Sequence, residues 1–384
     1  MRNNRLWLVY LTGFFLAVHF ASVSYINSSL ISQYVSSSVL SLLYVCASTI
    51  TIGLLVASPL LLRKFGSVFV FLSFILIEII ATISLGYASI PILVIAFFLI
   101  HVSAGPVLSL CLDINLEGEI DSEKTTGIKR SLLLTISNIA WVVSPLALVF
   151  LVNQNVFSKV YLLSGSVLII LFFIVKLFFK NTKTATVTES NIFKNIKLLK
   201  KHKDRARIIG SQFILNTFYA WMVIYLPILL NQEIGFSWSE IGYLFVFMFL
   251  PFVIFQLPAG FLADKKTGEK ELLVCGFIIM FISTLFLSTI KTPVFWVWAI
   301  TLFATRVGAG MTEVANESYF FKHVKEEDTG LISIFRIVRP LAYITAPLLV
   351  LPIINIFSSY RISFMFLSAV VLLGFLFIPK VDTR

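Results

Sequence analysis

The two halves of this chain carry the same landmarks at a nearly constant distance. Gly66 closes a basic turn after a long apolar segment, and Gly268 closes a similar turn 268 − 66 = 202 residues later. Pro145 and Pro347, both inside apolar segments, are also separated by 347 − 145 = 202 residues. A repeat of this length in a chain this apolar predicts two homologous helical bundles in series.

The composition excludes an ordinary water-soluble fold. Hydrophobic residues make up 58% of the chain and charged residues only 13%, with 38 Phe. A soluble fold needs more polar surface than this, and in lipid only helices or closed barrels satisfy their backbone groups. The apolar segments are long and do not alternate, so we expect an all-α membrane protein with twelve transmembrane helices in two pseudo-symmetric six-helix bundles.

Each expected span is long enough to cross a hydrocarbon core of about 30 Å. The even number of spans puts both termini on one side of the membrane. The domains expected are a bundle at 1–180, a linker at 181–207 and a second bundle at 208–384. The spans are expected at 6–26, 38–62, 67–87, 90–112, 131–151, 159–179, 208–230, 239–263, 272–290, 293–321, 330–354 and 360–379.

The net charge of +11 fits membrane topology and not nucleic-acid binding. Lys and Arg crowd the loops on one side, including the linker, which places both termini and the linker in the cytoplasm of a plasma (inner) membrane. Within the linker, apolar residues at helical spacing among lysines predict a basic amphipathic helix on lipid headgroups, or alternatively a charged tether. The three cysteines lie in apolar segments at a spacing that matches neither a disulfide framework nor a metal site.

The loop Gly260-Phe-Leu-Ala-Asp264-Lys265-Lys266-Thr-Gly268 is the strongest local motif. It resembles the cytoplasmic loop signature of the major facilitator superfamily. The resemblance implies secondary transport by two rocking bundles, with this loop as a latch that Asp264 closes. The first-half copy, which ends at Gly66, has no Asp, so a carboxylate latch is not expected there.

A second motif, Arg306-x-x-x-Gly310, resembles an arginine motif of proton-coupled exporters in the same superfamily. The first half has His101 at the matching place, followed by Gly105. Both ionisable residues fall near mid-membrane by residue count, where such groups are costly and usually functional. The alternative is an interior residue satisfied by a backbone carbonyl or by water.

Opposite charges flank the turn between the tenth and eleventh expected spans. Glu313 and Arg339 lie at about equal distances from residue 326, as do Glu317 and Arg336. In an antiparallel helix pair, the two residues of each pair would lie at about equal depth in the membrane. They would then form either a structural ion-pair network or a gate.

Polar and aromatic residues also fall in the spans that line the cavity in the family that this chain resembles. As a set they suit a pocket with an apolar wall and a few orienting groups, although interhelical hydrogen bonding explains each one alone. Glu78, in the third span, has no assigned role. The set comprises His19, Asn138, Gln212, Asn216 and Gln256, with Tyr25, Trp141, Tyr219, Trp221 and Tyr225 beside them.

These observations favour a secondary transporter of a small molecule, with proton coupling and no enzymatic activity. The alternatives are an importer or facilitator of a polar metabolite, and a non-transporting membrane receptor or scaffold. No phosphate-binding or catalytic motif is found, so neither cofactor nor metal is expected. The partners expected are the substrate, protons and membrane lipids, for a chain that acts as a monomer. The central-site candidates are His19, His101, Asn138, Asn216, Tyr219, Gln256 and Arg306.

Overall fold

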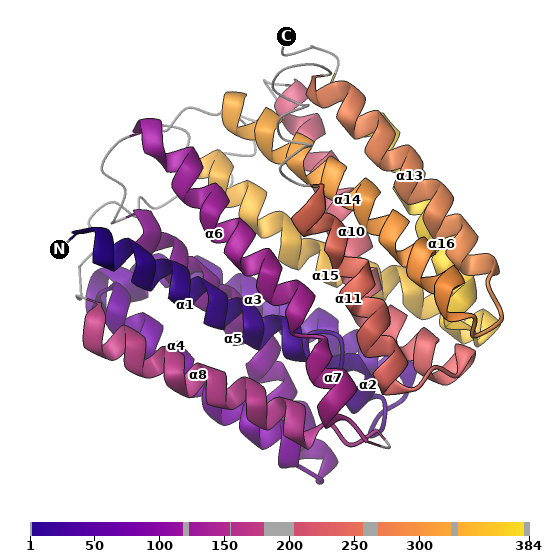
Figure 1. Ribbon diagram of the computed structural model, residues 1–384, viewed down its shortest axis with the longest axis horizontal. Coiled ribbons are helices and arrows are strands. Elements are labelled where there is room, and N and C mark those ends of the chain that lie inside the picture. The colour runs from indigo at the N-terminus through magenta and orange to yellow at the C-terminus, as the bar shows by residue number, and fades with distance from the viewer. Residues whose placement is uncertain are drawn as a thin grey trace. The chain divides into compact units, whose positions relative to one another are not determined.

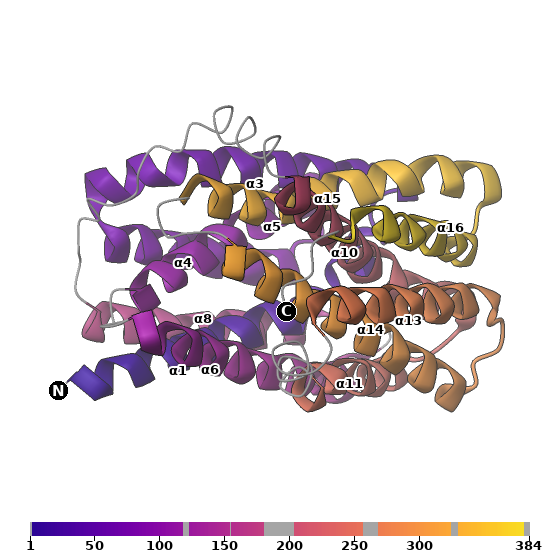
Figure 2. The ribbon, with the colours of Figure 1, turned by 90° about the horizontal axis from the view of Figure 1, so that it is seen from above.

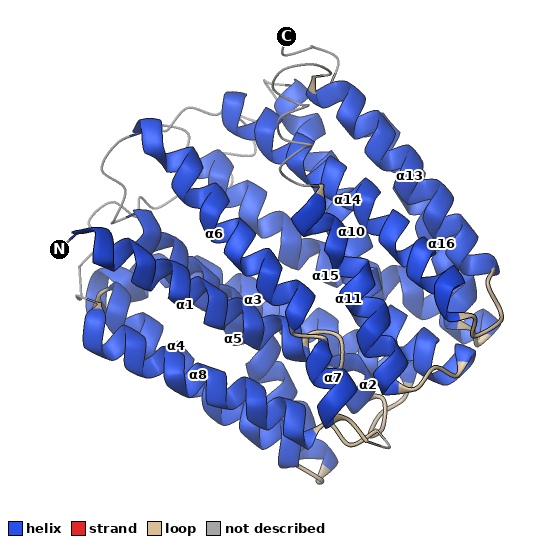
Figure 3. Ribbon diagram, in the orientation of Figure 1, coloured by secondary structure: helices blue, strands red, loops and turns tan. Residues whose placement is uncertain are grey.

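The computed structural model describes residues 2–117, 123–153, 155–179, 203–255, 268–323 and 329–379; for 2–5, 117, 123–131, 321–323, 329–334 and 336 it describes the backbone only. Helices account for nearly all of the regular structure (Figure 3). Within these residues, ten helical segments are long and apolar enough to cross a membrane. Arg306 lies in the apolar stretch of α14, which falls outside the ten, and α11 is a shorter apolar helix.

The chain divides into two compact units, Met1–Thr188 and Glu189–Arg384. In Figure 1 the colour runs from indigo to magenta along unit 1 and from pink-red through orange to yellow along unit 2. In unit 1 the helices are α1 (Arg2–Val23), α2 (Asn27–Ile31), α3 (Ser37–Phe65), α4 (Ser67–Tyr87), α5 (Pro91–Glu117), α6 (Glu123–Val143), α7 (Leu146–Leu151) and α8 (Ser158–Phe178). In unit 2 they are α10 (Lys203–Ile228), η1 (Leu229–Ile234), α11 (Trp238–Ile254), α13 (Glu269–Thr289), α14 (Phe295–His323), α15 (Thr329–Phe357), α16 (Tyr360–Leu372) and η2 (Leu373–Phe377).

The two units repeat one packing scheme. In unit 1, α4 packs on α5 and α8, and α1 packs on α5, α6 and α8, while α3 packs on α5. In unit 2, α13 packs on α14 and α16, and α10 packs on α14, α15 and α16, while α11 packs on α14. The same neighbours can be followed in Figures 1 and 2. Each of these six helices of unit 1 therefore has a counterpart in unit 2.

Local signals set equivalent helix ends in both units. Gly66 (φ 87°, ψ 159°) and Gly268 (φ 79°, ψ 160°) share one left-handed conformation, and each comes directly before a helix of 21 residues. Glycine has no Cβ and adopts this conformation without a clash. This agrees with the two turns that the sequence predicts to end at these glycines. The side chains of Ser36 and Ser237 cap α3 and α11 in the same way.

One expected span is interrupted. The span expected at 131–151 breaks at Ser144 and Pro145 into α6 and α7, at a residue that has no main-chain N–H to donate, whereas α15 continues through the equivalent Pro347. The expected first span, 6–26, corresponds to α1, which ends at Val23, and a turn leads from it into the short helix α2.

Candidate functional site

The guanidinium of Arg306 is buried inside unit 2, with only 1% of the residue exposed. It lies over the rings of Phe218, Tyr219 and Phe249, 5.5, 5.3 and 5.8 Å from their centroids. Its Nη2 also lies 3.6 Å from Met248 Sδ. Aromatic faces from α10 and α11 thus surround a permanent cation carried by α14 and stabilise it by cation–π attraction.

Glu313 shares this site with Arg306. The two residues are seven positions apart on α14, so they project from one face of the helix. The Tyr219 hydroxyl donates a hydrogen bond to Glu313 Oε2 at 3.1 Å, while the ring of the same tyrosine faces Arg306. The charges of Arg306 and Arg339 both act on this carboxylate. When Glu313 is ionised, these three groups carry one net positive charge, which favours an anion.

A second polar patch links α10 to α14. Asn316 is fully buried and donates to Gln212 Oε1 at 2.9 Å, and it accepts from the Ser211 hydroxyl at 2.7 Å. Asn216 donates to the main-chain oxygen of Gln212 at 2.8 Å. These bonds satisfy buried amides between helices, which is the ordinary role of such residues in membrane bundles.

The interior of unit 1 holds three ionisable side chains in contact. His19 on α1, Glu78 on α4 and His101 on α5 are 0%, 0% and 4% exposed. His101 Nδ1 lies 2.6 Å from Glu78 Oε1, and His19 Nε2 lies 3.1 Å from the same oxygen. Two ligands of one zinc ion would stand about 3.3 Å apart at bond lengths of about 2.0–2.1 Å, so these distances are those of hydrogen bonds.

Four neutral side chains surround this His–Glu–His cluster. The Tyr161 hydroxyl donates to Asn27 Oδ1 at 2.7 Å, and Asn27 Nδ2 lies 3.2 Å from His101 Nε2. Ser164 Oγ lies 2.7 Å from His19 Nδ1, and Thr82 Oγ1 lies 3.2 Å from His101 Nδ1. Five helices of unit 1 therefore contribute to one buried polar network.

The structure brings together some of the predicted residues and not others. His19 and His101 meet, at 5.7 Å between ring centroids, and so do Arg306, Tyr219 and Glu313. Asn138 lies on α6 and is half-buried. Several predictions lie outside the described residues, namely Gln256, Gly260, Asp264, Lys265 and Lys266, and the side chain of Arg336 is not described either, so the pairing of Glu317 with Arg336 stays a prediction.

Glu78 is the functional candidate that sequence reasoning left unexplained. A carboxylate in a long apolar span is itself a signal, and Thr82 one turn further along α4 is a second one. The partners of Glu78 lie 59 and 23 residues away in the sequence, on α1 and α5, and no local pattern identifies them.

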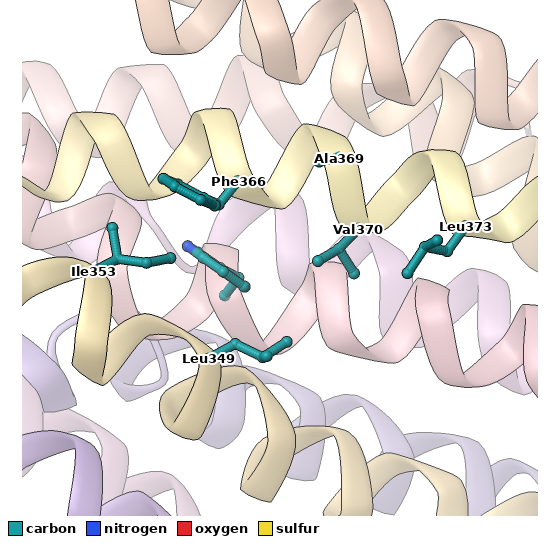
Figure 4. A pocket seen from close by; sticks show the side chains of 7 residues that line it. Leu349, Ile353, Phe366, Ala369, Val370 and Leu373 are labelled. Atoms are coloured by element: carbon teal, nitrogen blue, oxygen red, sulfur yellow. The ribbon is translucent and has the colours of Figure 1, made fainter.

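An apolar groove of about 360 Å³ lies elsewhere in unit 2, between α10, α15 and α16 (Figure 4). Trp221 forms part of its wall, and the Trp221 Nε1–H is already engaged, donating to Ser363 at 3.1 Å. A groove without a free polar group cannot orient a polar substrate, so we do not place the site here. Its other lining residues are Leu349, Ile353, Phe366, Ala369, Val370 and Leu373.

Comparison with known proteins identifies the fold. The family model of the Major Facilitator Superfamily matches residues 208–383. Among solved structures, the nucleoside transporter NupG matches with a TM-score of 0.75, and a point mutant of it with 0.77, each at 11% identity over 97% of this chain and 98% of theirs. A bacterial homolog of the human lysosomal transporter Spinster, in an inward-facing and unoccupied conformation, matches with a TM-score of 0.76 at 12% identity, over 98% of this chain and 96% of that one. No curated protein matches the sequence significantly.

Proposed function

We propose that this chain is a secondary active, proton-coupled member of the major facilitator superfamily, an integral membrane transporter of small molecules and not an enzyme. The family model over residues 208–383 and the fold shared with solved transporters support its membership. The site formed by Arg306 and Glu313 is the observation behind this proposal. A permanent cation in the apolar interior is costly, so its place among three aromatic rings beside Glu313 calls for a functional reason.

The chemistry around Arg306 favours a substrate with an anionic group and an apolar or aromatic body. The guanidinium can bind a carboxylate or phosphate through two parallel hydrogen bonds. Phe218, Tyr219 and Phe249 offer ring faces to the rest of the molecule. Glu313, held by Tyr219, can exchange a proton as the site changes its exposure to water, and this would link substrate binding to protonation.

We test this proposal with purified protein in proteoliposomes. A panel of nucleosides, organic anions and cationic amphiphiles is screened for uptake with and without an imposed pH gradient. The proposal expects organic-anion flux that depends on the pH gradient. Flux that is the same with and without the pH gradient would instead support a facilitator of a polar metabolite. Absence of flux for the whole panel would support a receptor or scaffold.

Two variants then test the arginine itself. Arg306→Gln should abolish flux of the anionic substrate, and Arg306→Lys should retain only part of it, because an ammonium lacks the planar fork of the guanidinium. Lys291→Gln serves as the control, since Lys291 is an exposed cation in the turn before α14. Equal flux in all three variants would place the substrate site elsewhere.

We further propose the topology implied by the basic loops. Both termini and the linker at 181–207 lie in the cytoplasm of the plasma (inner) membrane, and the chain acts as a monomer. Protease digestion of right-side-out and inverted vesicles carrying terminal tags tests this arrangement. Cleavage of either tag in right-side-out vesicles would contradict it.

A further inference from the structure

We propose that the His–Glu–His cluster of unit 1 is a binding site for a single exchangeable proton. Its use in transport rests on the proposed function, whereas its existence rests on geometry alone. His19, Glu78 and His101 all lie in unit 1, on three different helices, and none is more than 4% exposed. The number of protons that the cluster holds follows from its hydrogen bonds.

The hydrogen bonds fix the tautomer of His101. The Tyr161 hydroxyl donates to Asn27 Oδ1, so the amide nitrogen of Asn27 faces His101 Nε2 and donates to it. Nε2 must then carry a lone pair, and the ring hydrogen lies on Nδ1, 2.6 Å from Glu78 Oε1. His101 is therefore a neutral ring that donates to Glu78.

The bonds around His19 require one proton more. The Ser164 hydroxyl donates its one hydrogen to the main-chain oxygen of His19 at 3.2 Å, so it accepts from His19 Nδ1 at 2.7 Å. His19 Nε2 faces the oxygen that already accepts from His101, so a hydrogen must also lie between Nε2 and Glu78. Both sides of the His19 ring are then protonated, and the imidazolium balances the Glu78 carboxylate.

Loss of this proton would leave a negative charge that the site cannot support. From α1, α4, α5 and α8 the titratable groups that face the cluster are its own three members and Tyr161, and α2 contributes the neutral Asn27. Within the described residues the two imidazoles are the only ionisable partners of Glu78, and its Oε2 is buried without a hydrogen-bond partner. An unpaired buried carboxylate is expensive, so proton release requires water to reach the cluster. Protonation is thereby coupled to the opening of these helices.

The repeat shows that the fold itself does not need the cluster. The position in unit 2 equivalent to Glu78 is Met280, because 280 − 78 = 202, and the one equivalent to His19 is Trp221, because 221 − 19 = 202. There, a hydrogen bond between two neutral side chains, from Trp221 Nε1–H to Ser363, satisfies the buried polar groups where α10 and α16 cross. Two units with one packing scheme thus differ at these positions in whether they can hold a proton.

We test the site by ¹⁵N nuclear magnetic resonance of histidine-labelled, full-length protein in lipid nanodiscs. The chain has four histidines, so His19→Gln and His101→Gln assign the two buried rings. At neutral pH we expect one buried ring as an imidazolium and the other as the neutral Nδ1–H tautomer. Infrared spectra of the same samples report whether the proton resides on Glu78 instead, through the carbonyl stretch of a protonated carboxylic acid.

Matched variants separate the site from the fold. Glu78→Gln should abolish the imidazolium signal, and Glu240→Gln, which removes an exposed carboxylate on α11, should leave it unchanged. Ser164→Ala keeps every titratable group and should weaken the imidazolium signal at neutral pH, because the acceptor for His19 Nδ1–H is lost. Two neutral rings with no protonated acid in the unmodified protein, or an imidazolium that survives Glu78→Gln, would overturn the proposal.

A flux measurement then distinguishes this site from the proposed transport function. With the substrate found in the panel, Glu78→Gln should retain flux down a substrate gradient and lose its response to a pH gradient. If the spectra show the proton but the flux of Glu78→Gln still follows the pH gradient, the proton-binding site is confirmed and its role in coupling is contradicted.

Discussion

The crossing of α13 and α14 at Gly276 and Gly308 gives a sharp test of how unit 2 is packed. A Cβ added to Gly308 would lie 2.7 Å from the main-chain oxygen of Gly276 and 2.7 Å from the main-chain nitrogen of Met280. Both neighbours are backbone atoms, so no side-chain rotation relieves the contact. Gly308→Ala must therefore push the two helices apart.

The size of the effect follows from these distances. Ordinary contact for a Cβ begins at 3.4 Å, so the substitution is about 0.7 Å too close on two sides. Overpacking a close-packed interior costs about 1–3 kcal/mol. For a unit of this size each kcal/mol lowers the Tm by about 2–4 °C, so we expect Gly308→Ala to unfold several degrees earlier.

Two other glycines provide controls. Gly310 belongs to the same arginine motif, but a Cβ there would first meet Phe252 at 3.6 Å, which is ordinary contact. A Cβ at Gly53 would meet open space. The stability of each alanine variant should stay within about 0.5 kcal/mol of that of the unmodified protein. It is followed in detergent as the Tm, measured from the fluorescence of the six Trp residues. Equal Tm values for Gly308→Ala and Gly310→Ala would refute the inferred crossing.

Three further predictions test separate regions. Glu233 accepts hydrogen bonds from the Ser359 hydroxyl and from main-chain N–H groups at the start of α16, so Glu233→Ala should lower stability by about 1 kcal/mol, measured as a fall in Tm; an unchanged Tm would mean that water replaces the cap. Glu313 and Arg339 should show a coupling of about 0.5 kcal/mol or more in a double-mutant cycle of unfolding, and additive single substitutions would deny the interaction. Asp264→Asn should increase the cytoplasmic labelling of cysteines introduced beside Arg306 if Asp264 closes the latch loop, and labelling that does not change would leave the loop a topological role only.

The sequence predicted the helices well where local chemistry marks their ends. The span expected at 67–87 coincides with α4, because Gly66 stops the preceding helix and starts the next one. The short helix α2, which follows the expected first span, was not predicted, since residues 24–26 contain neither the Gly nor the Pro that usually marks a turn. The expected end of the eighth span at 263 lies outside the described residues, and α11 is described as far as Ile254.

The candidate sites were only half predictable, for a physical reason. Spacing within one helix tells which residues share a face, and the sequence also shows Arg306 as an ionisable residue inside an apolar stretch, where the structure buries it. Contact between helices depends on how each helix is rotated about its axis, and hydropathy specifies that rotation weakly in a chain that is apolar nearly all round. Glu78 therefore could not be joined to His19 and His101 from the sequence, although all three were visible as ionisable residues within spans.

The equivalence of His101 and Arg306 gives the two units different chemical capacities. Both residues occupy the helix that packs on α4 or on its counterpart α13, and both are almost completely buried. An arginine keeps its charge under all conditions in a protein, whereas a histidine can change its charge near neutral pH. Position 306 can therefore hold an anion but cannot carry a proton.

If the transporter is proton-coupled, another group has to carry the proton. That group is either Glu313, the carboxylate near Arg306, or the His–Glu–His cluster of unit 1, in which His101 is bonded to Glu78. The second site is the more isolated from competing charges, because its described ionisable partners belong to the cluster itself.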